Sequence, residues 1–312
     1  MSKILKLLLV LVLAFGAAYA AGDFLLPQQF AAAALAGQRS LAGLQRKEVD
    51  IPGQHIVYLE GGQGQPLLLL HGFSADKDNW PRIAMDLTSR YHVIAPDLPG
   101  YGESSQPPAA QARIEDQLNY LAQFVAALHL EHFDLGGNSM GGWISAAYAA
   151  AHPEQVNSLW LLAPAGLATA QPSDLVKIVR SGGHVPLVAR NPEEFGQLLD
   201  FVFVHRPWVP QAVIGVLAQH AAQQAAYNQQ IFDELAKEPP LEPQVQGLAT
   251  PTLIVWGDHD RALHDSGAEV LHGLLPHSQV VIMPDIGHLP MMETPAKTAA
   301  DYIAFRDALA KH

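Results

Sequence analysis

A serine held between glycines is the first sign of chemistry in the sequence. Gly137, Ser139 and Gly141 form a G-x-S-x-G pattern between an apolar run at 133–135 and a helical pattern at 140–151. In a strand, sharp turn and helix, this pattern lifts the serine hydroxyl clear of the backbone. The turn is so tight that side chains two residues before and after the serine would collide, so glycine is needed there. The sequence therefore predicts Ser139 as a nucleophile on an elbow made by Gly137 and Gly141.

A base and an orienting acid are expected later in the chain. A serine hydroxyl becomes a good nucleophile when a histidine takes its proton and a carboxylate orients that histidine. Asp260 follows the apolar run 253–255, and His288 follows the last apolar run at 280–282. We predict that Asp260 and His288 take these roles, with Asp258 as the rival acid.

Attack by a serine on a carbonyl group creates negative charge on the carbonyl oxygen, which needs N–H donors close by. One predicted donor of this oxyanion hole is the backbone N–H of Met140, the residue after the nucleophile. The second is the N–H of Phe73, in the loop that follows the apolar run 67–70. His71 in that loop is interpreted as a structural histidine, with a role as base as the alternative.

Short apolar runs alternate with helical patterns along most of the chain. Such alternation predicts an α/β fold with a doubly wound, mostly parallel sheet flanked by helices. Eight strands are predicted, at 49–51, 55–60, 67–70, 93–95, 133–135, 159–162, 253–255 and 280–282. Helices are predicted at 79–88, 113–128, 140–151, 266–274 and 294–310. The glycine-rich stretch 61–64 is interpreted as a hairpin turn.

The alternation breaks between residues 166 and 248, a stretch too long for a single crossover connection. Prolines divide this stretch, which predicts a cap of short helices inserted between two parts of the α/β core, 49–165 and 249–312. An apolar cluster in the cap includes Phe203 and Trp208. These side chains either form the core of the cap or line an acyl pocket, since ligand pockets are mostly apolar.

The N-terminal segment has the features of a membrane-targeting sequence. Lys3 and Lys6 precede an uncharged apolar run, and roughly 20 such residues are enough to span a bilayer. Residues 1–27 are predicted to form a transmembrane signal anchor in the cytoplasmic membrane, with the catalytic domain on the periplasmic side. The alternative is a secreted protein whose signal peptide is cleaved near Ala20. Residues 28–48 are predicted to form a juxtamembrane helix.

Small residues recur four apart in this segment, as in Gly16 and Ala20, a spacing that permits close contact between helices in lipid. A homodimer through the N-terminal helices is therefore a hypothesis.

Composition excludes several other functions. The formal net charge is −12 without a basic cluster, which argues against binding to nucleic acid. The chain has no cysteine, so thiol catalysis and thiolate metal sites are excluded. Its fifteen histidines lack the paired spacing of common metal motifs, and the glycines at 100 and 102 lack the third glycine of a dinucleotide fingerprint. No metal and no cofactor are predicted.

From about residue 49 to its end the chain resembles the α/β-hydrolases. The motifs that carry the resemblance are His71-Gly72-Phe73, the stretch 97–104, the glycine-flanked elbow at 137–142, Asp260 and Gly287-His288. Together with Lys77-Asp78-Asn79-Trp80, they resemble bacterial lipases and esterases of the family V type, and the apolar N-terminus resembles that of membrane-anchored phospholipases A. The resemblance implies a serine hydrolase that forms an acyl-enzyme, takes lipid esters as substrate and releases fatty acid. It also implies phospholipase A or lysophospholipase activity on membrane glycerophospholipids.

Three other functions remain open. A short-chain carboxylesterase or lipase would use the same residues on other esters. A C–C bond hydrolase of meta-cleavage products would share the Asn-Ser-Met-Gly-Gly sequence of the elbow, although soluble enzymes of that kind need no membrane segment. A lipid-binding protein without activity would tolerate the loss of Ser139.

Overall fold

The computed structural model describes residue 5, residue 16 and residues 22–311 of the chain. Most of the predicted membrane anchor, residues 1–27, lies outside these residues. Within the part that the structure describes, no helix is both long and apolar enough to cross a membrane.

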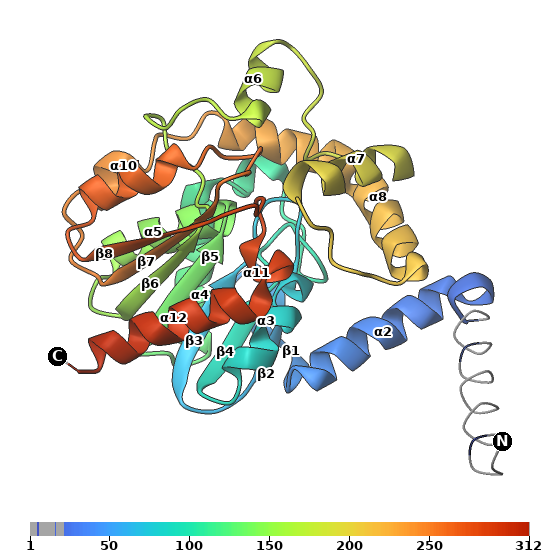
Figure 1. Cartoon of the computed structure of the whole chain (residues 1–312), viewed down its shortest axis with the longest axis horizontal. Helices are drawn as coiled ribbons and strands as arrows, with labels where there is room; N and C mark the ends of the chain where they lie inside the picture. The colour runs from blue at the N-terminus through green and yellow to red at the C-terminus, as the bar shows by residue number, and fades with distance from the viewer. Residues whose placement is uncertain (1–4, 6–15, 17–21, 312) are drawn as a thin grey trace.

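An eight-stranded sheet forms the centre of the molecule and confirms the predicted fold class (Figure 1). The strand order is β1-β2-β4-β3-β5-β6-β7-β8, and only the pairs β1–β2 and β2–β4 are antiparallel. The strands are β1 (Leu44–Ile51), β2 (Gln54–Gly61), β3 (Gln65–Leu70), β4 (Tyr91–Pro96), β5 (Phe133–Asn138), β6 (Val156–Leu162), β7 (Thr252–Gly257) and β8 (Ser278–Met283). All eight predicted strands are present.

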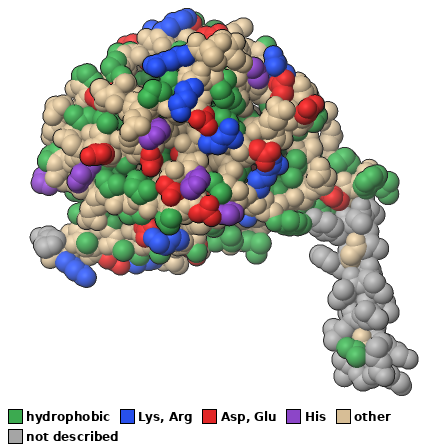
Figure 2. Space-filling view, turned by 45° about the horizontal axis from the view of Figure 1, so that its top comes forward, with side chains coloured by type: hydrophobic (Ala, Val, Ile, Leu, Met, Phe, Trp, Pro, Cys, Tyr) green, Lys and Arg blue, Asp and Glu red, His purple; other side chains and the backbone are tan. Residues whose placement is uncertain are grey.

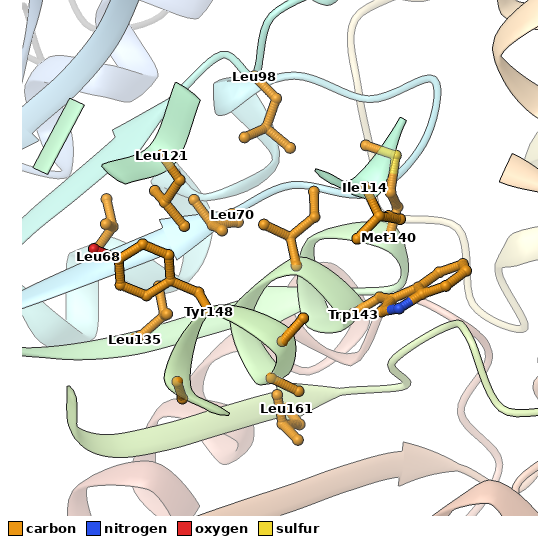
Figure 3. Packing of buried hydrophobic residues seen from close by; sticks show 14 of the residues in the cluster. Leu68, Leu70, Leu98, Ile114, Leu121, Leu135, Met140, Trp143, Tyr148 and Leu161 are labelled. Atoms are coloured by element: carbon orange, nitrogen blue, oxygen red, sulfur yellow. The ribbon is translucent and has the colours of Figure 1, made fainter. Parts of the chain in front are cut away.

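Helices cover both faces of the sheet because its central strands are apolar on both sides. Along β3, Leu68 and Leu70 pack into one buried cluster, and Leu67 and Leu69 into the other, as the two-residue period of a strand requires. The first cluster, shown in Figure 3, lies under α4 (Ile114–Ala127), α5 (Met140–Ala151) and α10 (Ser266–Leu274). The second lies under α3 (Pro81–Leu87), α11 (Pro290–Glu293) and α12 (Pro295–Leu309). Two short 3₁₀ turns, η1 (Lys77–Asn79) and η2 (Ala109–Gln111), complete the core.

The stretch between β6 and β7 contains four helices that lie over one end of the sheet (Figure 1). They are α6 (Asp174–Arg180), α7 (Pro192–Val202), α8 (Gln211–Leu235) and α9 (Glu242–Val245). We call residues 166–248 the cap. The long helix α8 runs beside α2 (Pro27–Leu41), and the backbone N–H of Ala212 in α8 donates to Asp23 Oδ1 at 2.7 Å.

The prediction of a juxtamembrane helix over residues 28–48 is wrong for its C-terminal part. Helix α2 stops at Leu41, Gly43 turns the chain with a φ of +68°, and β1 begins at Leu44. Such a φ favours glycine. The first part of β1, residues 44–48, was not predicted as a strand. It lies at the edge of the sheet, where most of its side chains are exposed and polar, so it has no apolar run.

Two smaller expectations also need correction. The stretch 61–64 is not a hairpin turn, because it connects β2 with β3 and β4 lies between these strands. Strand β8 is not buried on both faces: it lies at the other edge of the sheet, and Val280 and Ile282 are exposed.

The residues just before α2 expose an unusual amount of apolar surface. Phe24 is 88% exposed, Leu25 74% and Leu26 55%. Apolar side chains gather at this corner of the molecule, at the right of Figure 2. In the sequence, only Asp23 separates them from the uncharged apolar run of the N-terminal segment.

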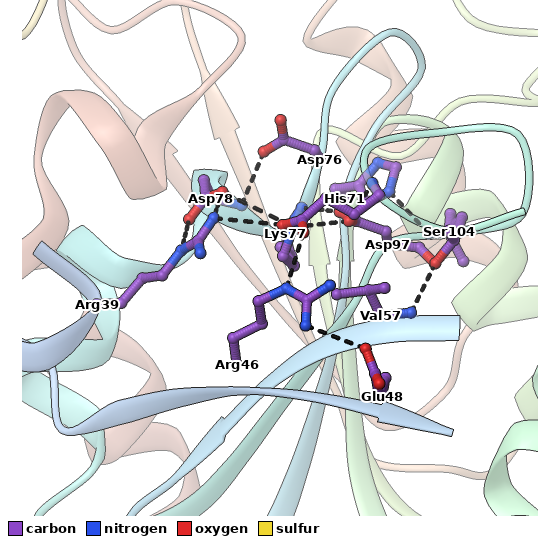
Figure 4. A network of polar contacts seen from close by, with 12 residues as sticks. Arg39, Arg46, Glu48, Val57, His71, Asp76, Lys77, Asp78, Asp97 and Ser104 are labelled. Atoms are coloured by element: carbon purple, nitrogen blue, oxygen red, sulfur yellow. Dashed lines mark hydrogen bonds and ion pairs between the residues drawn. The ribbon is translucent and has the colours of Figure 1, made fainter. Parts of the chain in front are cut away.

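A buried ion pair holds the loop after β3 against the loop after β4 (Figure 4). Lys77 Nζ lies 2.7 Å from Asp97 Oδ2 and 2.7 Å from Glu103 Oε1. Lys77 and Asp97 are 1% and 0% exposed. Burial acts to lower the pKa of Lys77, but the charges of Asp97 and Asp78 outweigh it and raise that pKa, so the ammonium stays protonated. Arg39 of α2 extends the network, with Nε 2.6 Å from Asp78 Oδ1.

Replacing Lys77 with Met is expected to lower the free energy of unfolding by about 3–5 kcal/mol, because it leaves the Asp97 carboxylate buried without its counter-ion. The measurement is the urea midpoint of the full-length protein. Lys297→Met removes the exposed ion pair with Asp301 and is the matched control, with an expected loss under about 1 kcal/mol. An equal loss of unfolding free energy in both variants would contradict a stabilising role for the buried pair of Lys77 and Asp97.

Candidate active site

The predicted nucleophile lies at a strained turn between β5 and α5. Ser139 has a φ of 56° and a ψ of −118°, a conformation that residues with side chains rarely adopt. A Cβ at Gly137 would come within 2.3 Å of the carbonyl oxygen of Gly141, and one at Gly141 within 2.2 Å of that of Leu70. Steric contact therefore requires both glycines: Gly137 because of the turn itself, as expected from the pattern, and Gly141 because of the adjacent strand β3. Ser139 is nearly buried, with 8% of its surface exposed.

His288 and Asp260 lie together although 28 residues separate them in the sequence. His288 Nδ1 is 2.7 Å from Asp260 Oδ2, and both side chains are buried. The other oxygen, Oδ1, accepts the backbone N–H groups of Ala262 and Leu263 at 2.8 and 2.9 Å. The carboxylate is thus fixed in place and leaves one oxygen for the imidazole.

The rival acid, Asp258, faces elsewhere. Its Oδ1 lies 2.6 Å from the exposed ring of His259 and accepts the backbone N–H of Asp285 at 2.7 Å. The hydrogen bond to His259 lowers the pKa of Asp258. The structure brings Asp260, and not Asp258, to His288.

Asn138 connects the serine elbow with the histidine loop, a role that the sequence analysis missed. Its Nδ2 donates to the carbonyl oxygen of His288 at 3.1 Å and to that of Leu162 at 3.0 Å. Its position directly before the serine was the one signal in the sequence. No hydrogen bond between Ser139 Oγ and the ring of His288 is found among the described residues, and such bonds are often long before substrate binds.

The loop after β3 lies against the serine. A Cβ at Gly72 would be 3.1 Å from Ser139 Cβ. His71 holds this loop: its Nδ1 lies 2.8 Å from the carbonyl oxygen of Gly72, and its Nε2 accepts the N–H of Leu98 at 3.0 Å. These partners place the proton on Nδ1, and burial lowers the pKa of His71, so the ring is neutral. His71 is therefore a structural residue, as predicted.

The two predicted oxyanion donors are free to bind a ligand. Within residues 22–311, neither the N–H of Phe73 nor that of Met140 has a protein acceptor. Both belong to segments that meet at Ser139, the loop after β3 and the first turn of α5. Two N–H groups beside a serine can stabilise charge on a carbonyl oxygen.

The cap reaches the same loop through helix α8. The ring of Phe73 packs edge-on against Phe232 with centroids 5.8 Å apart. Asn228, which is 5% exposed, donates from Nδ2 to Ser74 Oγ at 3.1 Å. The cap was expected to contain only short helices, but α8 has 25 residues, because no proline interrupts the stretch between Pro210 and Pro239. A single polar residue within this helix gave no signal for the contact in the sequence.

The two predicted acyl-pocket residues lie in different surroundings. Phe203 is 9% exposed and belongs to a buried apolar cluster of the cap, against which Phe73 packs. Trp208 is 73% exposed and lies outside that cluster; its carbonyl oxygen accepts a hydrogen bond from Arg82. Phe203 therefore belongs to the apolar cluster that contacts Phe73, whereas Trp208 does not.

Among the residues that the structure describes, no group of three or more His, Asp or Glu side chains could hold a metal ion. The chemistry available at the site comes from a serine, a histidine and a buried carboxylate. Such an arrangement can form and hydrolyse an acyl-enzyme.

Comparisons with known proteins identify the family. The chain matches the family of the alpha/beta hydrolase fold over residues 65–210 and 215–295. It is 39% identical to Lipase 3 of Moraxella sp. (strain TA144), covering 88% of both chains. It is 32% identical to the human monoacylglycerol lipase ABHD6, covering 78% of this chain and 76% of the relative.

The expected resemblance to the membrane phospholipase A called PlaF is also confirmed. The crystal structure of a membrane phospholipase A, described as a bacterial virulence factor, is 45% identical with a TM-score of 0.90, and the match covers 100% of both chains. Hydrolysis of esters is common to the enzymes so named. The chain therefore belongs to the α/β-hydrolases and is an ester hydrolase of the lipase and esterase type.

Proposed function

We propose that the protein is a phospholipase A that releases fatty acid from membrane glycerophospholipids. Ser139 attacks the ester carbonyl while His288 takes its proton. Asp260 orients the imidazole and stabilises its charge. The N–H groups of Phe73 and Met140 hold the oxyanion. His288 then protonates the leaving alcohol and activates the water that hydrolyses the acyl-enzyme.

The observation that carries this mechanism is the buried pair of His288 and Asp260. Asn138 joins the backbone of His288 to the elbow that presents Ser139, at 3.1 Å. Three segments far apart in the sequence thus meet around one serine. Phe203 and the apolar cluster of the cap are the proposed wall for the acyl chain.

A membrane substrate is supported by the surface just before α2. Phe24, Leu25 and Leu26 expose apolar side chains, and only Asp23 separates them from the apolar N-terminal run. Exposed apolar patches of this kind mark contact with lipid or protein. We propose residues 1–27 as the anchor in the cytoplasmic membrane, 49–165 and 249–312 as the periplasmic hydrolase core, and 166–248 as its cap. The structure of a 45% identical membrane phospholipase A favours this arrangement.

Pairing of two anchors through their small residues is the proposed mode of dimerisation. Crosslinking in native membranes is expected to trap a dimer, and a variant with Gly16 and Ala20 replaced by Leu is expected to be trapped less. A monomer under all crosslinking conditions would contradict the proposal.

The test of the substrate is fatty-acid release from phospholipid bilayers by the detergent-purified full-length protein. We expect release from diacyl and lysophospholipids, and we expect a serine-directed fluorophosphonate to stop it. Monoacylglycerol and a soluble short-chain ester are assayed in parallel. If the protein cleaves the short ester but releases no fatty acid from bilayers, it is a carboxylesterase and not a phospholipase. If it cleaves meta-cleavage products alone, it is a C–C bond hydrolase.

A further inference from the structure

Glu293 lies at the end of α11 and accepts three backbone N–H groups from two different segments. Its Oε1 accepts the N–H of Gly287 at 2.8 Å. Its Oε2 accepts the N–H groups of Val204 and His205 at 3.1 and 2.8 Å. Gly287 immediately precedes His288, whereas Val204 and His205 belong to the cap.

Two more contacts join the same segments. The backbone N–H of His288 donates to the carbonyl oxygen of Val202 at 2.8 Å, and His205 Nε2 lies 2.9 Å from Asp285 Oδ2. A Cβ at Gly287 would come within 2.6 Å of the carbonyl oxygen of Val202. The histidine loop, residues 285–288, therefore lies directly on the cap residues 202–205.

A carboxylate suits this place for a chemical reason. An ionised carboxylate offers acceptors on both oxygens, so it can bind N–H groups on two sides at once. An amide has one oxygen, and its NH₂ group would face an N–H donor on one side or the other. Burial acts to raise the pKa of Glu293 and the three N–H groups act to lower it, with a net rise.

We infer that Glu293 is a positioning residue that sets the place of the His288 imidazole by fixing the histidine loop to the cap. Asp260 controls the rotation of the ring through Nδ1. The backbone that carries the ring is held on the cap side by Glu293 and by the carbonyl oxygen of Val202, and on the elbow side by Asn138. The inference rests on the proposed roles of Ser139 and His288. A misplacement of about 1 Å at a catalytic group can lower a rate by about 100-fold.

Glu293→Gln in the full-length protein is the test, measured by kcat and KM on a soluble ester and by the rate constant of Ser139 labelling with a fluorophosphonate. We expect kcat and the labelling rate constant to fall by at least about tenfold, with KM within about twofold. The labelled fraction at the end point should stay near that of the unchanged protein. A purely structural role would reduce this fraction and leave the rate constant of the folded molecules unchanged.

Glu194→Gln is the matched control. Glu194 lies in the cap and, like Glu293, is a carboxylate that accepts a backbone N–H, that of Arg190 at 2.8 Å, but its hydrogen-bond partners lie in the cap and not in the histidine loop. The control should keep kcat within about twofold of the unchanged protein. A kcat for Glu293→Gln within twofold of this control would overturn the inference.

Glu293→Asp covers the case in which the Gln variant does not fold. It keeps the charge but is one methylene shorter, so it can reach one of the two segments and not both. The same fall in kcat at constant KM is expected, and an unchanged kcat would overturn the inference. If the unchanged protein is not labelled at Ser139, the proposed function fails as well; if it is labelled and the Glu293 variants match the control, only the inference fails.

Discussion

Ser139→Ala is expected to lower kcat/KM for every ester substrate by about 10⁶-fold, which corresponds to about 8 kcal/mol of transition-state stabilisation. The reason is that no acyl-enzyme can form without the hydroxyl. The backbone donors at Phe73 and Met140 remain, so a small rate above that in water should persist. The measurement is ester hydrolysis over hours together with labelling by a fluorophosphonate, which should be absent.

Ser145→Ala provides the control for this experiment. Ser145 lies in the same helix α5, and its Oγ donates to the carbonyl oxygen of Gly141 at 2.7 Å. Its loss removes one buried hydrogen bond near the elbow and no reacting group, so activity should stay within a few-fold. Turnover by Ser139→Ala near that of Ser145→Ala would remove Ser139 as the nucleophile.

The local features of the fold were predictable because they depend on neighbours in the sequence. The apolar runs at 67–70 and 159–162 became strands buried on both faces, and the pattern at 266–274 became α10 with the same limits. The elbow was also predictable. Its two glycines are required by contacts within the turn itself and with the adjacent strand, so the G-x-S-x-G pattern alone identifies the place.

The contacts that assemble the site were not predictable in the same way. Asn138 and His288 are 150 residues apart, and the glutamate at 293 accepts from a cap segment 88 residues earlier. These contacts involve single polar residues and no repeating pattern. Trp208 illustrates the same limit, since an apolar residue within an apolar stretch gives no indication that it lies at the surface.

The cap contributes to the site from two sides. Asn228 of α8 contacts the loop that carries the predicted oxyanion donor Phe73, and the carbonyl oxygen of Val202 accepts the N–H of His288. The same helix α8 contacts the start of the chain, where Ala212 donates to Asp23. Helix α8 therefore contacts both the N-terminal segment and the loop that carries Phe73.

Asp260→Asn is expected to lower kcat by about 10⁴-fold with little change in KM, for a reason that the hydrogen bonds around it supply. The N–H groups of Ala262 and Leu263 will hold the amide oxygen of the new side chain in the place of Oδ1. Its NH₂ group must then face His288 Nδ1, which can accept that hydrogen bond only without a proton. The proton moves to Nε2, and the imidazole can no longer accept the proton of Ser139.

Asp258→Asn separates this effect from a general loss of charge near the site. Asp258 lies two residues away, and its partners are the ring of His259 and the N–H of Asp285. Its replacement should leave kcat within a few-fold, because the amide oxygen of Asn can still accept the N–H of Asp285 in the histidine loop, and His288 keeps its tautomer and the carboxylate of Asp260. Stopped assays on a soluble ester, with the folded fraction of each variant checked by thermal melting, compare the two. A larger loss of kcat for Asp258→Asn than for Asp260→Asn would make Asp258 the acid that orients His288. The expected result, a larger loss for Asp260→Asn, would assign that role to Asp260.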